Sequence, residues 1–558
     1  SSDWSSDVCS SDLGLLNILP METFVDNESG FRLDIHFENV FTSIDDVMAE
    51  QKPKIEKALK LIQRMENGEI VNHTEVKKES EDRQVDHYNH RMVEEKVKGK
   101  SLAHSLKLWE ETLEFAKKIE AGEIKPTGGD KYNTIIFNGI GGSYLGPLML
   151  IIAKYGMDYN TTANLPFKIY FISNTDADMY HQVTKGIDYQ RAIMVHLSKS
   201  GTTSETAGNM HTWMAECEAK GLVLGEHNAC VTIANSLLDK IAQEKKFIRD
   251  WHMEIDTGGR TSVCSAIGMA PCAFAHLDFA AFLKGMSHMD SLTRRAEGNP
   301  AALLAAVIDK NSQINGFKNM IVLCYSEFMR EYAHYLQQLY MESLGKEYKI
   351  DGTEARVGQT VFGGVGTGEQ HSFMQQVQKG LGDCFVRLIS FEKRENDYYN
   401  AQAGSMGRQL LAFLKGTEKA LIQNKRPFIT SSFHERNEFT FGMMIALEER
   451  IVSFLAAFMD INAYDQPGVQ DGKLAASGVN KISAQIVKAL ADNPNVNGTA
   501  AEILKTLGIE GTYYEAEAIF NDIYNNNKVE NSYPEIKDLN VKREYSAAKK
   551  QYIFNFSK

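Results

Sequence analysis

The sequence lacks any uninterrupted apolar run of membrane-spanning length, although 43% of its 558 residues are hydrophobic. A spanning helix needs about 20 consecutive apolar residues, so this absence argues against an integral membrane protein. The chain also lacks a basic excess, because 60 lysines and arginines stand against 73 aspartates and glutamates. The net charge of −13 argues against a general nucleic-acid binder. A small anionic ligand stays compatible with this charge, since one pocket needs only a few local cations and backbone donors.

Cysteine is scarce and unpatterned. The cysteines are odd in number and contain no C-x-x-C pair, which favours a reducing cytoplasm and excludes a cysteine-rich zinc site. Three of them lie in apolar, strand-like runs, where thiols behave as small buried hydrophobic groups. The seven are Cys9, Cys217, Cys230, Cys264, Cys272, Cys324 and Cys384.

The first residues, "SSDWSSDVCSSDL", lack both the basic start and the apolar core of a signal peptide. They repeat Ser-Ser-Asp three times without a helical or strand period. We expect residues 1–13 to be a non-native leader or a disordered tail. Residues 14–125 read as mostly helical and charged, and they suggest no chemistry.

From about Lys131, short apolar runs alternate with helix-length segments, and a long helix is predicted from about Asn437 to Ile461. The first four runs are "YNTIIFNG", "FKIYFISN", "RAIMVHLS" and "NACVTIAN". This alternation predicts an α/β fold with two doubly wound, mainly parallel sheets flanked by helices. We place the two units at residues 126–300 and 301–500, with a helical and polar extension over 501–558. Ligands of such sheets bind beyond the carboxyl ends of the strands, so the loops after the strands are the candidate sites.

The loop "FNGIGGSYLGP" follows the first of these strands. A dinucleotide fingerprint starting at Gly139 requires a glycine where Tyr144 stands, so the main support for a nicotinamide or flavin cofactor is missing. Gly142 and Ser143 can still bring backbone N–H groups close to an anion or a sugar. A tight strand-to-helix turn explains the loop equally well.

The loop "SKSGTTSET" gathers hydroxyl groups and one lysine before a helix. Such donors at a helix N-terminus suit a phosphate ester, and no G-K-[ST] follows a P-loop spacing, so the phosphate need not belong to a nucleotide. Thr202 and Glu205 also fit a capping box, and the two interpretations are compatible. The candidate phosphate-binding residues are Ser198, Lys199, Ser200, Thr202 and Thr203.

Four further segments present polar side chains of interest. Arg260 follows two glycines, Gln338 and Glu342 lie one helical turn apart, and His371 is expected just inside a helix start. A glycine-bearing loop, "DQPGVQDGK", contains the other two, Gln466 and Lys473. Taken singly, each of these is more often a surface or ion-paired residue than a catalytic one.

Taken together, these segments resemble a known family. "GIGGSYLGP", "SKSGTTSET", "GGRTSVCSAIG", "MESLGKE", "GTGEQHSF" and "DQPGVQDGK" follow the order and approximate spacing of glucose-6-phosphate isomerases, which are built from two sugar-isomerase (SIS) domains. The resemblance runs from about residue 132 to residue 476. It implies aldose–ketose isomerisation of glucose 6-phosphate and fructose 6-phosphate through a cis-enediol(ate), in glycolysis and gluconeogenesis.

The resemblance also implies roles for individual residues. Glu342 matches the base that moves a proton between C1 and C2, and Arg260 matches the arginine beside the enediolate. His371 matches the ring-opening histidine, with Glu205 orienting it and Lys473 assisting at the ring oxygen. The substrate- and phosphate-binding positions match Gly142, Ser143, Ser198, Lys199, Ser200, Thr202, Thr203, Gln338 and Gln466.

The implied reaction is redox-neutral, so it requires neither a nicotinamide nor a metal, and we expect no cofactor. The resemblance implies a cytoplasmic homodimer in which His371 reaches the neighbouring subunit's pocket. Two alternatives remain open. In one, the chain is an isomerase that also accepts mannose 6-phosphate. In the other, the SIS domains bind a sugar phosphate as a sensor, without turnover. A sensor has no need of Glu342, His371 and Lys473 together, which favours the enzyme.

Overall fold

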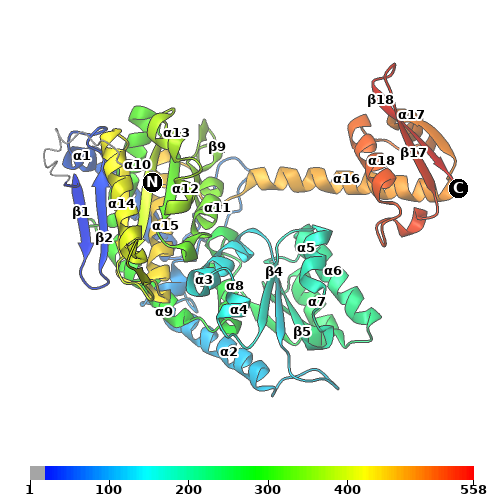
Figure 1. Ribbon diagram of the computed structural model, residues 1–558, viewed down its shortest axis with the longest axis horizontal. Coiled ribbons are helices and arrows are strands. Elements are labelled where there is room, and N and C mark those ends of the chain that lie inside the picture. Colours follow the sequence, from blue (N-terminus) through cyan, green and yellow to red (C-terminus); the bar gives the residue numbers. More distant parts are fainter. Residues whose placement is uncertain (1–18) are drawn as a thin grey trace. The chain divides into compact units, whose positions relative to one another are not determined.

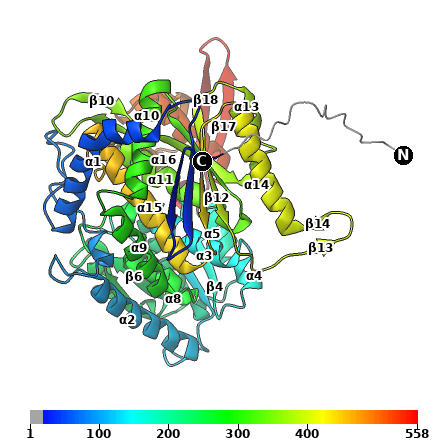
Figure 2. The same cartoon turned by 90° about the vertical axis from the view of Figure 1, so that its left-hand side faces the viewer.

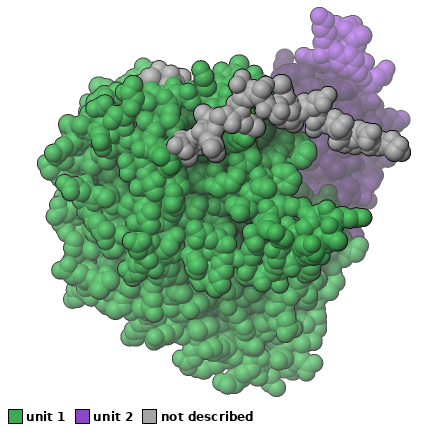
Figure 3. All heavy atoms as spheres, turned by 60° about the vertical axis from the view of Figure 1, so that its left-hand side comes forward, with its two compact units in different colours: residues 1–465 green, residues 466–558 purple. Residues whose placement is uncertain are grey.

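The computed structural model describes residues 19–558, apart from the side chains of 313–315 and 469–474. The chain forms two compact units, residues 1–465 and residues 466–558 (Figure 3). Each unit has a hydrophobic core of its own. The prediction for residues 1–13 lies outside the described residues.

The first sheet of unit 1 has five parallel strands in the order β4-β3-β5-β6-β7. The continuous apolar runs of the sequence predict four of them, and those strands are confirmed. The short fifth strand, β7, was not foreseen. The strands are β3 (Thr134–Asn138), β4 (Lys168–Ile172), β5 (Ala192–Leu197), β6 (Asn228–Thr232) and β7 (Arg249–His252).

Helices cover both faces of this sheet (Figure 1). Successive side chains of β3 point to opposite faces, so Ile135 and Phe137 join the large core while Ile136 packs in a second cluster with Trp213. Burial on both faces explains why the strands read as unbroken apolar runs. The covering helices include α3 (Leu145–Tyr155), α5 (Ala177–Thr184), α6 (Ser204–Ala219), α7 (Leu237–Lys245) and α8 (Ala266–Phe274).

The second sheet has the order β1-β2-β15-β12-β8-β11, and its last four strands are parallel. Two mainly parallel sheets flanked by helices were predicted, and this architecture is confirmed. The strands are β1 (Glu22–Asp26), β2 (Phe31–His36), β8 (Asn319–Cys324), β11 (Thr360–Val365), β12 (Cys384–Phe391) and β15 (Phe428–Phe433).

The hairpin β1–β2 differs from the expectation of a mostly helical region over 14–125. These two strands, dark blue in Figure 1, extend the second sheet, and β2 pairs antiparallel with β15. Phe31, Leu33 and Ile35 are fully buried, whereas Arg32 is exposed. The six-residue "FRLDIH" therefore alternates with the period of a strand. A single short alternation is a weak signal, which is why the sequence alone missed it.

Long helices fill the space around the second sheet. The helix predicted from about Asn437 to Ile461 is confirmed as α15 (Glu438–Met459), which runs beside α9 (Phe279–Thr293) (Figures 1 and 2). Further helices of unit 1, both long and short, are α1 (Ile44–Glu66), α2 (Leu102–Ala121), α10 (Pro300–Asn315), α11 (Tyr332–Leu344), α12 (Gly366–Glu369), α13 (Met374–Lys379) and α14 (Met406–Gln423).

A buried ionic network joins three of these helices, α1, α9 and α15, to the short turn Asn89–Arg91. Asp290 of α9 accepts from Arg91 Nε at 2.7 Å and from Arg450 Nε of α15 at 2.9 Å. Arg450 also binds Glu66 of α1 at 2.7 Å, and Arg91 pairs with Glu449. Burial alone would raise the pKa of Asp290, but the two arginines hold it below its usual range. Each charge in this core is therefore compensated by neighbours from another segment.

Asp290→Asn is expected to lower the free energy of unfolding by about 3–5 kcal/mol, because two buried arginines lose their shared carboxylate. Urea denaturation followed by circular dichroism measures this. Asp130→Asn, at an exposed position, is the control and should shift stability by less than about 0.5 kcal/mol. Equal denaturation midpoints for the two variants would contradict the role assigned to the network.

Unit 2 begins with the long helix α16 (Pro467–Asp492) and ends in a three-stranded antiparallel sheet, β16-β18-β17. The expected helical and polar extension over 501–558 therefore also contains strands. Phe554 and Phe556, two residues apart on β18, are both buried in the unit's core. The remaining elements are β16 (Val496–Thr499), α17 (Ala500–Leu507), α18 (Tyr513–Asn526), β17 (Asn540–Ser546) and β18 (Gln551–Ser557).

Among the helices within residues 19–558, none combines the length and the apolar composition that crossing a membrane requires.

Candidate active site

The predicted site loops of the first sheet follow two neighbouring strands. β3 lies between β4 and β5, so the chain runs outward from β3 in both directions, and the sheet has its topological switch point there. The glycine loop follows β3 and the hydroxyl-rich loop follows β5. Open α/β sheets bind ligands in the crevice at this point, so the two loops occupy the expected place.

The glycine loop lies directly against the loop that carries Arg260. Gly141–Ser143 form a short 3-10 turn, and Gly259–Cys264 form another. A Cβ on Gly142 would lie 1.8 Å from the carbonyl oxygen of Gly259, so only glycine allows this approach. The same loop contacts α11, because a Cβ on Gly141 would lie 2.9 Å from the Gln338 amide nitrogen.

The hydroxyl-rich loop is held by its own side chains. The Gly201 N–H donates to Ser198 Oγ at 3.1 Å, and the hydroxyls of Ser200 and Thr202 are 2.6 Å apart. Gly201 has a φ of +75°, and its Cα lies against Leu238, so a side chain there would be both strained and crowded. Lys199 extends from the loop, and its Nζ donates to the carbonyl of Thr257 at 3.0 Å.

The predicted capping box of Thr202 and Glu205 is wrong. The helix α6 is capped by Thr203, whose side chain makes no capping hydrogen bond. The Thr202 hydroxyl pairs with Ser200 instead, and the Glu205 carboxylate accepts from the neighbouring Ser204 hydroxyl at 3.0 Å. Thr202 therefore does not cap the backbone N–H groups in the first turn of α6.

Glu342 is held at both carboxylate oxygens near the end of α11. Its Oε2 lies 3.3 Å from Arg260 Nε, and its Oε1 accepts from Gln338 Nε2 at 3.4 Å. Arg260 is 4% exposed, whereas the Glu342 side chain is 26% exposed. The structure thus brings together a buried cation, an amide and a partly accessible carboxylate beside the glycine loop. A carboxylate so oriented is suited to removing a proton from a bound carbon acid.

The Arg260 guanidinium is fixed from its other side by the turn before unit 2. Its Nη1 donates to Ala463 O at 3.1 Å and its Nη2 to Asp465 O at 2.8 Å. Burial lowers the pKa of Arg260, and the charges of Glu342 and Asp465 oppose this. The side chain therefore keeps a fixed direction.

Sequence reasoning missed Lys346, which lies immediately behind Glu342. Its Nζ donates to the Glu342 carbonyl at 2.6 Å and lies 3.2 Å from Asp465 Oδ1. Burial, with Arg260 nearby, lowers the pKa of Lys346 to about 8, and Asp465 opposes this. The signal was present in "MESLGKE", where Lys346 follows the glycine that ends the helix.

His371 was expected just inside a helix start, and this is wrong, because it lies in the turn between α12 and α13. α12 ends at Glu369, two residues before it. The imidazole is exposed and makes no hydrogen bond or ion pair with any part of the chain that the structure describes. It therefore does not join the cluster around Glu342 within one subunit.

Gln466 and Lys473 belong to unit 2. They were expected in a loop, but Gln466 caps α16 and Lys473 lies within that helix. Pro467 at the first helical position explains the difference, because its fixed φ suits a helix start. The side chain of Lys473 lies outside the described residues. The substrate contact implied for Gln466 and the role at the ring oxygen implied for Lys473 stay predictions.

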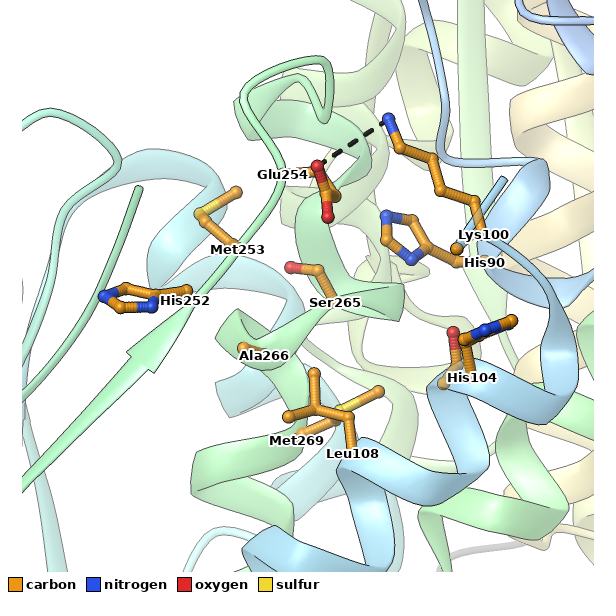
Figure 4. Close-up of a pocket in the computed structure, with 12 residues that line it drawn as sticks. His90, Lys100, His104, Leu108, His252, Met253, Glu254, Ser265, Ala266 and Met269 are labelled. Carbon is orange, nitrogen blue, oxygen red and sulfur yellow. Dashed lines mark ion pairs between the residues drawn. The ribbon is translucent and has the colours of Figure 1, made fainter. Parts of the chain in front are cut away.

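A small cavity of about 100 Å³ lies behind the Arg260 loop rather than at Glu342 (Figure 4). Figure 4 shows His90 and Lys100 on one side of it and Glu254 on the other, with Lys100 and Glu254 forming an ion pair at 3.8 Å. Among the described residues, none of those predicted for the site lines this cavity. The cavity marks where the N-terminal segment packs against the loop after β7.

One group of described residues, Asp239, Asp250 and His252, has donor atoms close enough together for a metal ion. His252 Nε2 is already hydrogen-bonded to Asp239 Oδ1 at 2.9 Å, and none of the three belongs to the predicted site. This group carries no argument for a metal in the reaction.

The family model for phosphoglucose isomerase matches residues 43–499. This chain belongs to the phosphoglucose isomerase family. All residues predicted for the site lie inside the matched range. The family match therefore includes Gln466 and Lys473 as well as the cluster around Glu342.

Individual relatives of this family agree with the match. The chain is 37% identical to the glucose-6-phosphate isomerase of Gloeothece citriformis over 83% of this chain and 86% of the relative. It is 35% identical to that of Geobacter sulfurreducens over 89% and 92%. The crystal structure of a glucose-6-phosphate isomerase from Chlamydia trachomatis superimposes with a TM-score of 0.72 at 28% identity, covering 82% of this chain and 89% of that one.

Proposed function

We propose that this chain interconverts glucose 6-phosphate and fructose 6-phosphate by ring opening and a cis-enediol(ate) intermediate. The observation that carries the proposal is the Glu342 carboxylate, bound between Arg260 and Gln338 beside the glycine loop of a phosphoglucose isomerase family member.

Glu342 is the proposed base that moves the proton between C1 and C2. The carbon acid is weak, so the base needs fixed alignment, and its two contacts supply this. Arg260 supplies a positive charge where negative charge develops on the enediolate oxygens. The Arg260 contacts to Ala463 and Asp465 hold that charge in place before substrate arrives. Gln338 is the proposed substrate contact between the glycine loop and the base.

The phosphate group is proposed to bind at the hydroxyl-rich loop. Ser198, Ser200, Thr202 and Thr203 offer hydroxyl donors, and Lys199 offers a positive charge. The first turn of α6 adds backbone donors to the same loop. Gly142 and Ser143, in the loop after the adjacent strand, are proposed to contact the sugar.

Ring opening is proposed to use His371 of a second subunit in a homodimer. An exposed imidazole that bonds to none of the described residues fits a group that completes a neighbouring site. Glu205 is proposed to orient that imidazole, Lys473 to assist at the ring oxygen, and Gln466 to contact the substrate. A histidine suits this step because its ordinary pKa lies near neutral pH.

The two sheets are proposed to represent the two SIS domains, over about 126–300 and 301–500. We also propose a cytoplasmic location, in line with a glycolytic and gluconeogenic role and with cysteines that are all reduced among the described residues.

Isomerase activity is expected without any added cofactor and in the presence of EDTA. The proposed proton transfers use only side chains of the protein, so chelation removes nothing that they need. A coupled assay with fructose 6-phosphate, before and after dialysis against EDTA, measures this. Activity that is lost on chelation and restored by a divalent cation would contradict the metal-free mechanism.

A further inference from the structure

The loop between β7 and Arg260 is held from outside by the N-terminal segment, residues 83–100. Arg83 Nη1 donates to the carbonyl of Ile255 at 2.9 Å, and Lys100 Nζ lies 3.4 Å from Asp256 Oδ2. The sequence suggested no chemistry for this segment. In the structure its residues His90, Gly99 and Lys100 line one side of the cavity in Figure 4.

Thr257 is the most constrained residue of that loop. It is fully buried, and its hydroxyl donates to Asp86 Oδ1 at 2.7 Å. His90 Nε2 lies 3.0 Å from the same hydroxyl oxygen. A hydroxyl has one proton, and that of Thr257 is used in the hydrogen bond to Asp86. The Thr257 oxygen therefore accepts the hydrogen bond from His90. Asp86 is 1% exposed and also accepts from Lys100 Nζ at 2.8 Å.

The carbonyl of Thr257 contacts the hydroxyl-rich loop. It accepts from the Lys199 ammonium at 3.0 Å, which leaves two further N–H groups on that ammonium. Thr257 also precedes Arg260 by three residues. Thr257 is therefore hydrogen-bonded to Lys199 of the hydroxyl-rich loop, and it lies in the loop that carries Arg260.

The charges around Lys199 depend on the same segment. Burial, together with the charge of Arg83, lowers the pKa of Lys199 to about 8, and the charges of Asp86 and Asp256 oppose this. The carboxylates that hold the loop thus also favour the charged form of the lysine. A charged lysine is the form that attracts a phosphate.

We propose that Thr257 is a positioning residue for phosphate binding, which directs the Lys199 ammonium through its carbonyl while Asp86 fixes Thr257 through its hydroxyl. The inference rests on the proposed function, since it assigns Lys199 to the substrate phosphate. It adds a connection between the N-terminal segment and the site.

Thr257→Val removes the hydroxyl and keeps the volume. The KM of this variant for fructose 6-phosphate is expected to rise about tenfold, and its kcat to stay within about twofold of wild type. The reason is that phosphate contacts are the same in the ground and transition states. The inhibition constant of inorganic phosphate is expected to rise by the same factor. Thr257→Ser, which keeps the hydroxyl, should restore both constants to within about twofold of wild type.

Thr112→Val is the matched control. Thr112 is also fully buried, but its hydroxyl bonds only within α2, to Leu108 O at 2.8 Å, so its KM should be unchanged. If Thr257→Val is folded and its KM and phosphate inhibition are within twofold of wild type, the inference is overturned. A fall in kcat alone overturns it as well, because that result places the effect on the chemical step.

Asp86→Asn provides a second test should Thr257→Val fail to fold. It keeps the shape and removes the charge, and the same rise in KM and in the phosphate inhibition constant is expected. Unchanged constants in this variant reject the role of Asp86. A wild-type protein with no isomerase activity refutes the proposed function instead. Calorimetric binding of inorganic phosphate to wild type and to Thr257→Val then still decides the inference.

Discussion

Glu342→Gln is expected to lower kcat by about a thousandfold, which is the usual scale for removing a general base. The amide keeps the shape of the side chain and its contact with Gln338, but it does not accept a proton from carbon. Exchange of the sugar C2 proton with solvent should stop at the same time. Binding of inorganic phosphate should stay within about twofold of wild type, because the hydroxyl-rich loop is untouched. Isotope exchange followed by NMR measures the proton transfer directly.

Glu347→Gln is the control, because Glu347 is exposed and ion-paired with Arg356 at 3.2 Å on the surface. Its activity should equal that of wild type. Proton exchange at a near wild-type rate in Glu342→Gln would rule Glu342 out as the base. Loss of phosphate binding would point instead to a disturbed site.

Mixing the Glu342→Gln and His371→Ala proteins is expected to restore about a quarter of wild-type activity. In a shared site, a mixed dimer has one pocket with both defects and one pocket with neither. Random pairing makes about half of the dimers mixed, and half of their pockets are intact, by two-fold symmetry. The exposed His371 imidazole, which bonds to none of the residues that the structure describes, is the feature that makes this experiment informative.

Each variant measured alone supplies the baseline, and both are expected to be nearly inactive. Subunit exchange has to be verified separately, for example with two differently labelled wild-type samples. Recovery below a few per cent under exchanging conditions would mean that each pocket is built from one chain. The shared site would then be rejected, whereas the isomerase reaction would stand.

The sequence predicts those parts of the fold that leave a local signal. Strands buried on both faces, such as β3 and β5, appear as continuous apolar runs, and the helix α15 appears as a long periodic segment. The hairpin β1–β2 was missed because only alternate residues of a six-residue strand are apolar. The start of α16, within "DQPGVQDGK", was taken for a loop because its glycines outweighed the proline that starts the helix.

Site residues are likewise predictable where they form a short local motif, and they are missed where their contacts join distant segments. Glycines, clustered hydroxyls and the pair Gln338 and Glu342 leave short motifs, so their positions were predicted. Thr257 and Asp86 are 171 residues apart, and no local pattern connects them. The Thr202–Glu205 capping box failed because a hydroxyl has several possible partners, and only the folded loop decides among them.

The pairing of β2 with β15 has a consequence for how the chain is made. His36 lies opposite Phe428, so about 400 residues separate the two strands. At a synthesis rate of about 5–20 residues per second, roughly 20–80 s pass between the emergence of β2 and that of its neighbour. During that time β2 can pair with β1, but its β15 side has no partner, and Phe31, Leu33 and Ile35 lack the core in which they are fully buried. The nascent chain therefore carries this apolar hairpin uncovered through most of its own translation.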